Sequence, residues 1–167
     1  SAAGLPDSAV VQAAFVAVDP YSGHILAMIG GRNFNESKFN RATQALRLPG
    51  SAFKPFVYTA AIDNNRFTTD VLDDNAITIR EHDGGIWDPE NYDKTFMGPM
   101  TLREAFKRSR NLIAIKLAQE IGPNRIALYA RTMGIKTRIE PVTSIAIGTS
   151  AIPLLDLVAA YAVFPNK

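Results

Sequence analysis

Two strand-like segments near the start of the chain, followed by mostly helical patterns, constrain the fold most. Residues 10–18 (VVQAAFVAV) and 24–29 (HILAMI) are rich in β-branched and other apolar residues, which favours strands buried on both faces. Residues 19–23 (DPYSG) are typical of a turn, because proline fixes φ and glycine accepts a positive φ. Together these segments predict a β-hairpin.

The rest of the chain shows helix signals. Thr101 and Glu104 form a capping-box pattern that opens one helix, and glycines or prolines bound the others. Only short strand-like pieces, such as residues 76–80, lie between residues 67 and 87. The predicted helices cover residues 51–63, the segment from 101, and residues 111–121, 123–134 and 151–164. A hairpin followed by helices predicts an α+β fold without βαβ alternation.

Composition excludes several functions. The chain has no cysteine, and its two histidines, His24 and His82, lie far apart, so we expect neither a metal site nor thiolate chemistry. A formal net charge of +2 and the lack of a large basic cluster argue against nucleic acid as a partner. No motif for an organic cofactor is present. The apolar run at residues 151–164 contains Pro153 and Asp156 and is shorter than a membrane span, so it predicts a buried helix.

Residues 51–54 (SAFK) fit the pattern S-x-x-K at the start of a predicted helix. Positions i and i+3 share a helix face, so the Lys54 amine can approach the Ser51 hydroxyl and serve as the base that a serine nucleophile needs. Backbone N–H groups at the helix start can also stabilise an oxyanion. The alternative is a serine helix cap followed by a solvated lysine.

Residues 109–111 (SRN) fit the pattern S-x-N between two predicted helices. On a tight turn, the Ser109 hydroxyl and the Asn111 amide can point into one cleft, where the first relays protons and the second holds a substrate amide. Serine and asparagine are also common at helix ends, so a purely structural interpretation stays open.

The order S-x-x-K and then S-x-N, 58 residues later, occurs in penicillin-binding proteins and serine β-lactamases. Beyond these motifs the chain resembles the transpeptidase domain of class A, bifunctional penicillin-binding proteins. The resemblance covers nearly the whole chain after residue 10 and is carried by residues 30–63, 87–93 (WDPENYD), 98–122 and 145–164 (IAIGTSAIPLLDLVAAYAVF). It implies a β-lactamase/transpeptidase-like fold, with the hairpin as part of a central antiparallel sheet beside a mostly helical subdomain.

The resemblance also implies roles for individual residues. Ser51 would be acylated by the penultimate D-Ala of a peptidoglycan stem peptide, and an amine of a neighbouring stem would then take the acyl group to form a cross-link. Lys54 would be the base, Ser109 would pass a proton to the leaving group, and Asn111 would hold the substrate peptide. β-Lactams would acylate Ser51 as substrate mimics.

One motif of the family has no counterpart here. A third triplet, K-T-G, lines the far side of the family's cleft, whereas residues 136–138 read Lys-Thr-Arg. We therefore expect residues 1–167 to be the N-terminal part of the transpeptidase domain, with the remaining C-terminal half as a partner that supplies the K-T-G strand and covers the hairpin. The class A resemblance further implies a membrane-anchored parent with a glycosyltransferase domain, working on the outer face of the bacterial cytoplasmic membrane.

Two other functions remain as alternatives. A serine β-lactamase of class A needs a glutamate followed four residues later by asparagine, but Ser144 stands four residues after Glu140. A non-catalytic β-lactam sensor would keep Ser51 and Lys54, and only the lifetime of its acyl adduct would reveal it. The aromatic residues Trp87, Tyr92 and Phe96 either line a substrate groove or pack a loop.

Overall fold

A computed structural model describes residues 11–80 and 84–166 of the chain. These residues form two compact units. The hairpin unit comprises residues 11–47, 133–137 and 152–166, and the helical unit comprises residues 48–80, 84–132 and 138–151.

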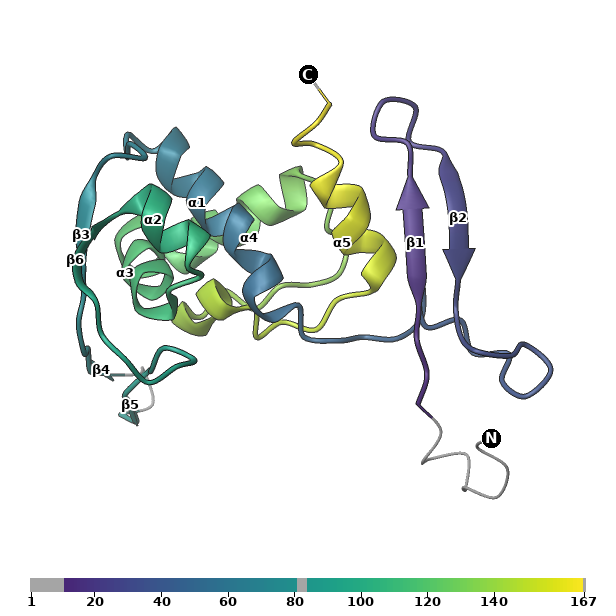
Figure 1. Cartoon of the computed structure of the whole chain (residues 1–167), viewed down its shortest axis with the longest axis horizontal. Helices are drawn as coiled ribbons and strands as arrows, with labels where there is room; N and C mark the ends of the chain where they lie inside the picture. Colours follow the sequence, from purple (N-terminus) through teal and green to yellow (C-terminus); the bar gives the residue numbers. More distant parts are fainter. Residues whose placement is uncertain (1–10, 81–83, 167) are drawn as a thin grey trace. The chain divides into compact units, whose positions relative to one another are not determined.

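The hairpin unit contains the predicted β-hairpin. Strands β1 (Phe15–Val18) and β2 (Ile25–Ile29) pair antiparallel, with Phe15 opposite Ile29 (Figure 1). Asp19 closes the turn, because its backbone oxygen accepts from the Gly23 N–H and its side chain accepts from Ser22 and Tyr21. Helix α5 (Leu154–Tyr161) packs against β1. The hairpin prediction is confirmed.

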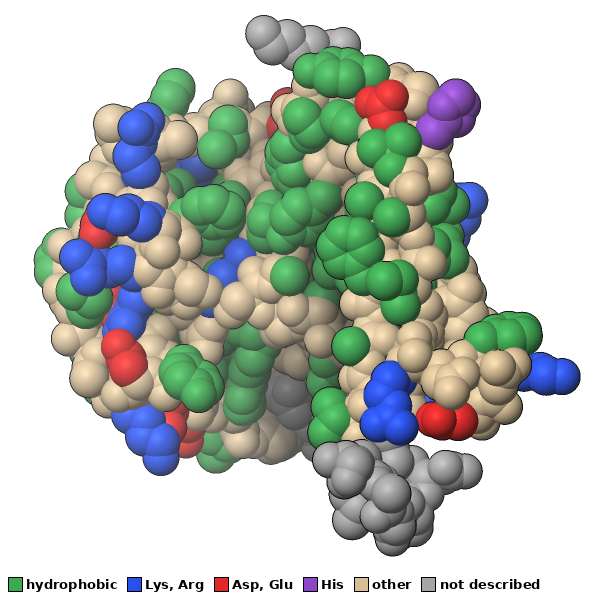
Figure 2. Space-filling view, turned by 45° about the vertical axis from the view of Figure 1, so that its right-hand side comes forward, with side chains coloured by type: hydrophobic (Ala, Val, Ile, Leu, Met, Phe, Trp, Pro, Cys, Tyr) green, Lys and Arg blue, Asp and Glu red, His purple; other side chains and the backbone are tan. Residues whose placement is uncertain are grey.

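The described residues alone do not bury both faces of the two strands, whose cover was predicted to come from the C-terminal half of the domain. Phe15, Ile25, Leu26 and Ile29 are each at least half exposed, and hydrophobic side chains are visible on the surface in Figure 2. Apolar composition reports a preference for the strand conformation, whereas burial depends on the elements that pack on each face. Within this unit, α5 is the helix that contacts β1.

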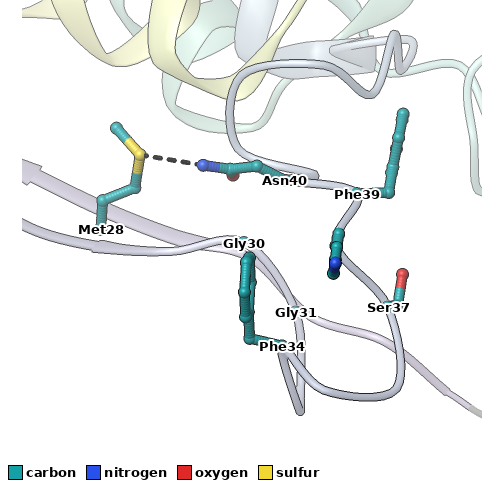
Figure 3. A pocket seen from close by; sticks show the side chains of 8 residues that line it. Met28, Gly30, Gly31, Phe34, Ser37, Phe39 and Asn40 are labelled. Atoms are coloured by element: carbon teal, nitrogen blue, oxygen red, sulfur yellow. Dashed lines mark hydrogen bonds between the residues drawn. The ribbon is translucent and has the colours of Figure 1, made fainter.

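A glycine and an asparagine close the loop that follows β2. Asn40 Nδ2 donates to Met28 Sδ at 3.4 Å, and the Arg41 N–H donates to the Gly30 carbonyl oxygen at 2.9 Å (Figure 3). A Cβ atom at residue 30 would overlap the Asn40 side chain, so only glycine fits there. A small pocket results, with Phe34 and Phe39 at its rim.

The helical unit is built from four α-helices, two 3-10 helices and two strand pairs among its described residues. Strand β3 (Val71–Asp74) pairs with β6 (Gly98–Thr101), and β4 (Ile79–Arg80) pairs with β5 (Ile86–Trp87), both antiparallel. The helices are η2 (Gly50–Phe53), α1 (Lys54–Asp63), α2 (Leu102–Lys107), α3 (Asn111–Ile121), α4 (Pro123–Thr132) and η3 (Thr143–Ile147).

The helix predictions agree with these elements apart from their ends. The predicted N-cap is present, since the Glu104 N–H donates to Thr101 Oγ1 at 3.2 Å, while the Glu104 carboxylate bonds Arg108. The segment predicted as a helix over 151–164 is helical only from Leu154 to Tyr161. Proline disfavours a helical conformation of the residue before it, and Ile152 pairs with Arg47 in a β-bridge instead.

The core of the helical unit lies between α1, α3 and η3. Its largest side chains are fully buried, and burial of this kind is the main favourable contribution to folding. They are Phe53, Phe56, Val57, Leu112, Ile113, Ile115, Leu117, Ile126 and Ile145. None of the helices described here is long and apolar enough to cross a membrane.

Candidate active site

Ser51 lies on a turn that leads directly into α1. Gly50 has a φ of +56°, Ser51 follows in the single 3-10 turn η2, and Pro55 stands at the start of α1 where its missing N–H is tolerated. The predicted helix over 51–63 is therefore present, with a tighter first turn. This turn leaves the Ser51 side chain exposed at the helix start.

Lys54 is buried one turn later, with only 2% of its surface exposed. Its Nζ atom lies 2.5 Å from the Ser109 carbonyl oxygen, 2.9 Å from Ser109 Oγ and 2.7 Å from Asn111 Oδ1. Burial of the amine, together with the nearby positive charge of Arg110, lowers the pKa of Lys54 to about 8. The alternative of a solvated lysine is thus wrong.

Ser109 stands at the end of α2 in a left-handed conformation, with a φ of +55°. The Ser109 N–H donates to the Phe106 oxygen and the Arg110 N–H donates to the Ala105 oxygen, both at 2.9 Å, which is the Schellman ending of a helix. Glycine is the usual residue at this position, so a serine here carries backbone strain. The turn aims its hydroxyl and carbonyl at Lys54.

Asn111 is the first residue of α3. Its Nδ2 donates to the Glu90 carbonyl oxygen at 3.0 Å, so its Oδ1 faces the Lys54 amine. The S-x-x-K and S-x-N patterns are thus joined by the hydrogen bonds of Lys54 to Ser109 and Asn111.

A cleft of about 340 Å³ lies beside these groups. Tyr92, which is 99% exposed, stands in its lining, whereas Trp87 and Phe96 are not among the described residues that line it. The lining residues are Ser51, Asn91, Tyr92, Asp93, Arg108, Ser109, Arg110 and Asn111. Three of the four predicted site residues, Ser51, Ser109 and Asn111, therefore open onto one cleft, and Lys54 contacts two of them from below the surface.

Sequence analysis missed three buried polar residues next to this cleft. Asp74, Asn91 and Arg110 are each at most 5% exposed, and Asn91 and Arg110 both bond Asp74. They lie 17 to 36 residues apart in sequence, and no periodicity or motif links them. The sequence pointed to Arg110 only through its position between the serine and the asparagine of S-x-N.

The residues that a β-lactamase or a K-T-G strand would need are engaged elsewhere. The Glu140 carboxylate is exposed, pairs with Arg138 at 3.0 Å and is absent from the described lining of the cleft. The Thr137 hydroxyl donates to Asp156 within the hairpin unit. In residues 11–80 and 84–166, no group of acidic, histidine or cysteine side chains is placed to hold a metal ion.

An exposed serine at a helix start, three residues before a buried lysine of lowered pKa, is chemically equipped for nucleophilic catalysis. Residues 13–166 match the penicillin binding protein transpeptidase domain, and the chain belongs to this family.

Known proteins resemble the chain over most of its length. It is 38% identical over 157 residues to penicillin-binding protein 1A of Pseudomonas aeruginosa, which covers 93% of this chain and 19% of that protein. It is 38% identical over 160 residues to penicillin-binding protein 1A of Neisseria lactamica, and the match covers 94% of this chain and 20% of that protein. The chain thus spans about a fifth of the length of these curated relatives.

Solved structures share the fold. Penicillin-binding protein 1A from Haemophilus influenzae superposes with a TM-score of 0.88 at 36% identity, covering 92% of this chain and 23% of that one. PonA1 from Mycobacterium tuberculosis, in complex with penicillin V, superposes with a TM-score of 0.79 at 26% identity, and the match covers 91% of this chain and 44% of that one. The predicted fold class, the α+β fold of penicillin-binding transpeptidase domains, is confirmed.

Proposed function

We propose that this chain carries the acyl-transfer residues of a D,D-transpeptidase that cross-links peptidoglycan through a serine acyl-enzyme and is inhibited by β-lactams. One observation supports this most directly. The buried Lys54 amine contacts Ser109 and Asn111 beside the cleft on which Ser51 is exposed. The transpeptidase family of the chain and the penicillin V complex of PonA1 support the substrate class and the inhibitor class.

In the acylation step, Ser51 Oγ attacks the carbonyl carbon of the penultimate D-Ala while Lys54 takes the hydroxyl proton. The tetrahedral intermediate then collapses, the bond to the nitrogen of the terminal D-Ala breaks, and Ser109 passes a proton to that nitrogen. Asn111 holds the peptide of the donor stem. An amine of a second stem attacks the resulting ester, which releases Ser51 and forms the cross-link.

The contacts of Lys54 connect its amine to a hydroxyl that can relay a proton. Two of its three contacts, the Ser109 carbonyl oxygen and Asn111 Oδ1, can only accept. The third, Ser109 Oγ, can accept from the amine and can also donate, so it can receive a proton once Lys54 has taken that of Ser51. Lys54 and Ser109 thus form one route for a proton beside Ser51.

The partners and the location follow from the same proposal. Stem peptides and β-lactams occupy the cleft, and the parent protein is anchored in the cytoplasmic membrane with a glycosyltransferase domain, facing outward. The similarity to proteins named penicillin-binding protein 1A supports this placement.

Acylation by benzylpenicillin tests the proposal. In the full-length protein that carries this chain we expect one penicilloyl adduct per molecule, located on Ser51 by peptide mapping with mass spectrometry, and none in Ser51→Ala. The adduct should persist for many minutes, because no glutamate is among the described residues that line the cleft. An adduct on Ser109, or rapid turnover of a chromogenic cephalosporin that Glu140→Gln abolishes, would overturn the assignment.

The lowered pKa of Lys54 predicts a pH dependence. Because the base must be neutral, the rate constant for acylation should rise about tenfold between pH 7 and pH 9 and level off above a pKa of about 8. The folded-state pKa lies below the unfolded value of 10.5, so the free energy of unfolding should also increase as the pH rises between these two values. Stopped-flow acylation and chemical denaturation over this range measure both, and a flat rate profile would contradict the assignment.

A further inference from the structure

We propose that Asn91 and Arg110, together with Asp74, are positioning residues that hold Ser109 and Asn111 against Lys54. This inference rests on the proposed function and adds to it the residues that fix the second half of the site. We name Asp74, Asn91 and Arg110 the clamp.

The ionic part of the clamp is a buried arginine with two carboxylates. Arg110 Nε donates to Asp74 Oδ2 and Arg110 Nη1 donates to Asp93 Oδ2, both at 2.8 Å, while Nη2 bonds the Thr95 carbonyl oxygen. The Asp74 side chain is fully buried and that of Arg110 is 5% exposed, so the pair is shielded from solvent. A guanidinium held by several acceptors at once has its orientation fixed. Arg110 is the residue between Ser109 and Asn111, so the turn is fixed with it.

The polar part of the clamp caps α3 from another segment. Arg110, the residue at the N-cap position, makes no side-chain cap bond, which leaves the first N–H groups of the helix in need of an acceptor. Asn91 Oδ1 accepts from the Asn111 N–H at 2.9 Å and from the Leu112 N–H at 3.3 Å. Asn91 Nδ2 in turn donates to Asp74 Oδ1 and to the Thr95 carbonyl oxygen, both at 2.9 Å.

Both site residues depend on this arrangement. Ser109 is strained at a φ of +55°, and such a conformation persists only when the surroundings over-determine it. The bonds of Arg110 fix the residue that follows Ser109, and those of Asn91 fix the backbone of Asn111. The Asn111 side chain then spans from Glu90 to Lys54. The clamp therefore sets where all three contacts of the Lys54 amine lie.

Stability alone does not account for the clamp. Exchanging a buried ion pair for well-packed apolar residues is often neutral or stabilising, so such a pair is weak evidence for a stabilising role. Without Arg110, the Asp74 carboxylate would still accept two hydrogen bonds, one from Asn91 Nδ2 and one from the Met97 N–H at 3.0 Å. Apart from its charge, which lowers the pKa of Lys54, the feature that needs Arg110 is the placement of the turn on both sides of it.

The test uses the full-length protein that carries this chain and measures acylation of Ser51 by benzylpenicillin. We expect Arg110→Met to slow the chemical step about 10- to 100-fold, because a displacement of about 1 Å costs a factor of that size, with little change in the penicillin concentration at half-saturation. Arg110→Lys should recover part of the loss. Arg66→Gln, which removes an arginine paired with Glu120 and Asp70 outside the cleft, should leave acylation unchanged.

Two further variants keep the proposal testable if Arg110→Met folds poorly. Asp93→Asn removes the negative charge of the exposed partner of Arg110 without emptying the core, and should slow the chemical step about two- to fivefold. Ser109→Ala combined with Arg110→Lys should lose less than the product of the two single losses, because Arg110 acts through Ser109.

The outcomes separate this inference from the proposed function. Acylation of Ser51 in the wild type, combined with slow, folded and non-additive Arg110 variants, supports the clamp. Wild-type rates in folded Arg110→Met and Asp93→Asn, or fully multiplicative losses in the double variant, overturn the clamp and leave the proposed function intact. Failure of the wild type to acylate at Ser51 overturns the proposed function itself.

Discussion

Lys54→Ala is expected to lower the rate constant for acylation of Ser51 by about a thousandfold or more, because it removes the proposed base for the serine proton. The fold should survive. The change removes an amine that is costly to bury, although it leaves a cavity and two carbonyl acceptors, Ser109 O and Asn111 Oδ1, without their donor. Lys54→Met fills that cavity without restoring a base, so it should be equally slow.

Lys116→Ala is a matched control for this loss. Lys116 Nζ also bonds a backbone carbonyl oxygen, that of Asp73, and an amide oxygen, that of Asn75, but neither lines the cleft. Its removal should leave acylation within about twofold of the wild type, since it removes contacts of the same kind away from the reacting atoms. Near-normal acylation in Lys54→Ala, with an unchanged circular dichroism spectrum, would show that the proton goes to another group.

Gly148→Ala is expected to destabilise the fold and to displace Ser51, the proposed nucleophile. Gly148 ends η3 with a φ of +71° against the backbone of Gly50, the residue before Ser51. A Cβ atom there would lie 2.6 Å from the Gly50 nitrogen and closer still to its oxygen, so Gly50 must move. We expect the free energy of unfolding to fall by about 2 kcal/mol or more and acylation to slow about 100-fold.

The contact with Gly50 can be separated from backbone strain. Gly23 has a similar φ of +73°, and a Cβ atom there would meet nothing within 4 Å. Gly23→Ala should therefore show only the cost of the left-handed conformation, about 1 kcal/mol, with normal acylation. Chemical denaturation and penicillin acylation of both variants measure the two effects. If Gly148→Ala acylated as fast as Gly23→Ala, the contact with Gly50 would not control the position of Ser51.

Local patterns in the sequence predicted much of the helical unit. The N-cap at Thr101 and the proline near the start of α1 act through neighbouring backbone groups, so their effect can be deduced without the fold. The helix predicted over 151–164 was too long, because hydrophobic periodicity does not reveal the β-bridge that Ile152 makes with Arg47.

By itself, the sequence determined the α+β class, the hairpin, the helix order and the pairing of S-x-x-K with S-x-N. The first three follow from the spacing of residues along a helix and from turn chemistry, and the pairing of the two motifs follows from the resemblance to a known family. The tertiary structure decided which of the four site residues touch, how deeply Lys54 is buried and thus the direction of its pKa shift, and which groups hold the S-x-N turn. Asp74, Asn91 and Arg110 come from segments far apart in the chain, and polar contacts between such segments leave no periodic trace in the sequence.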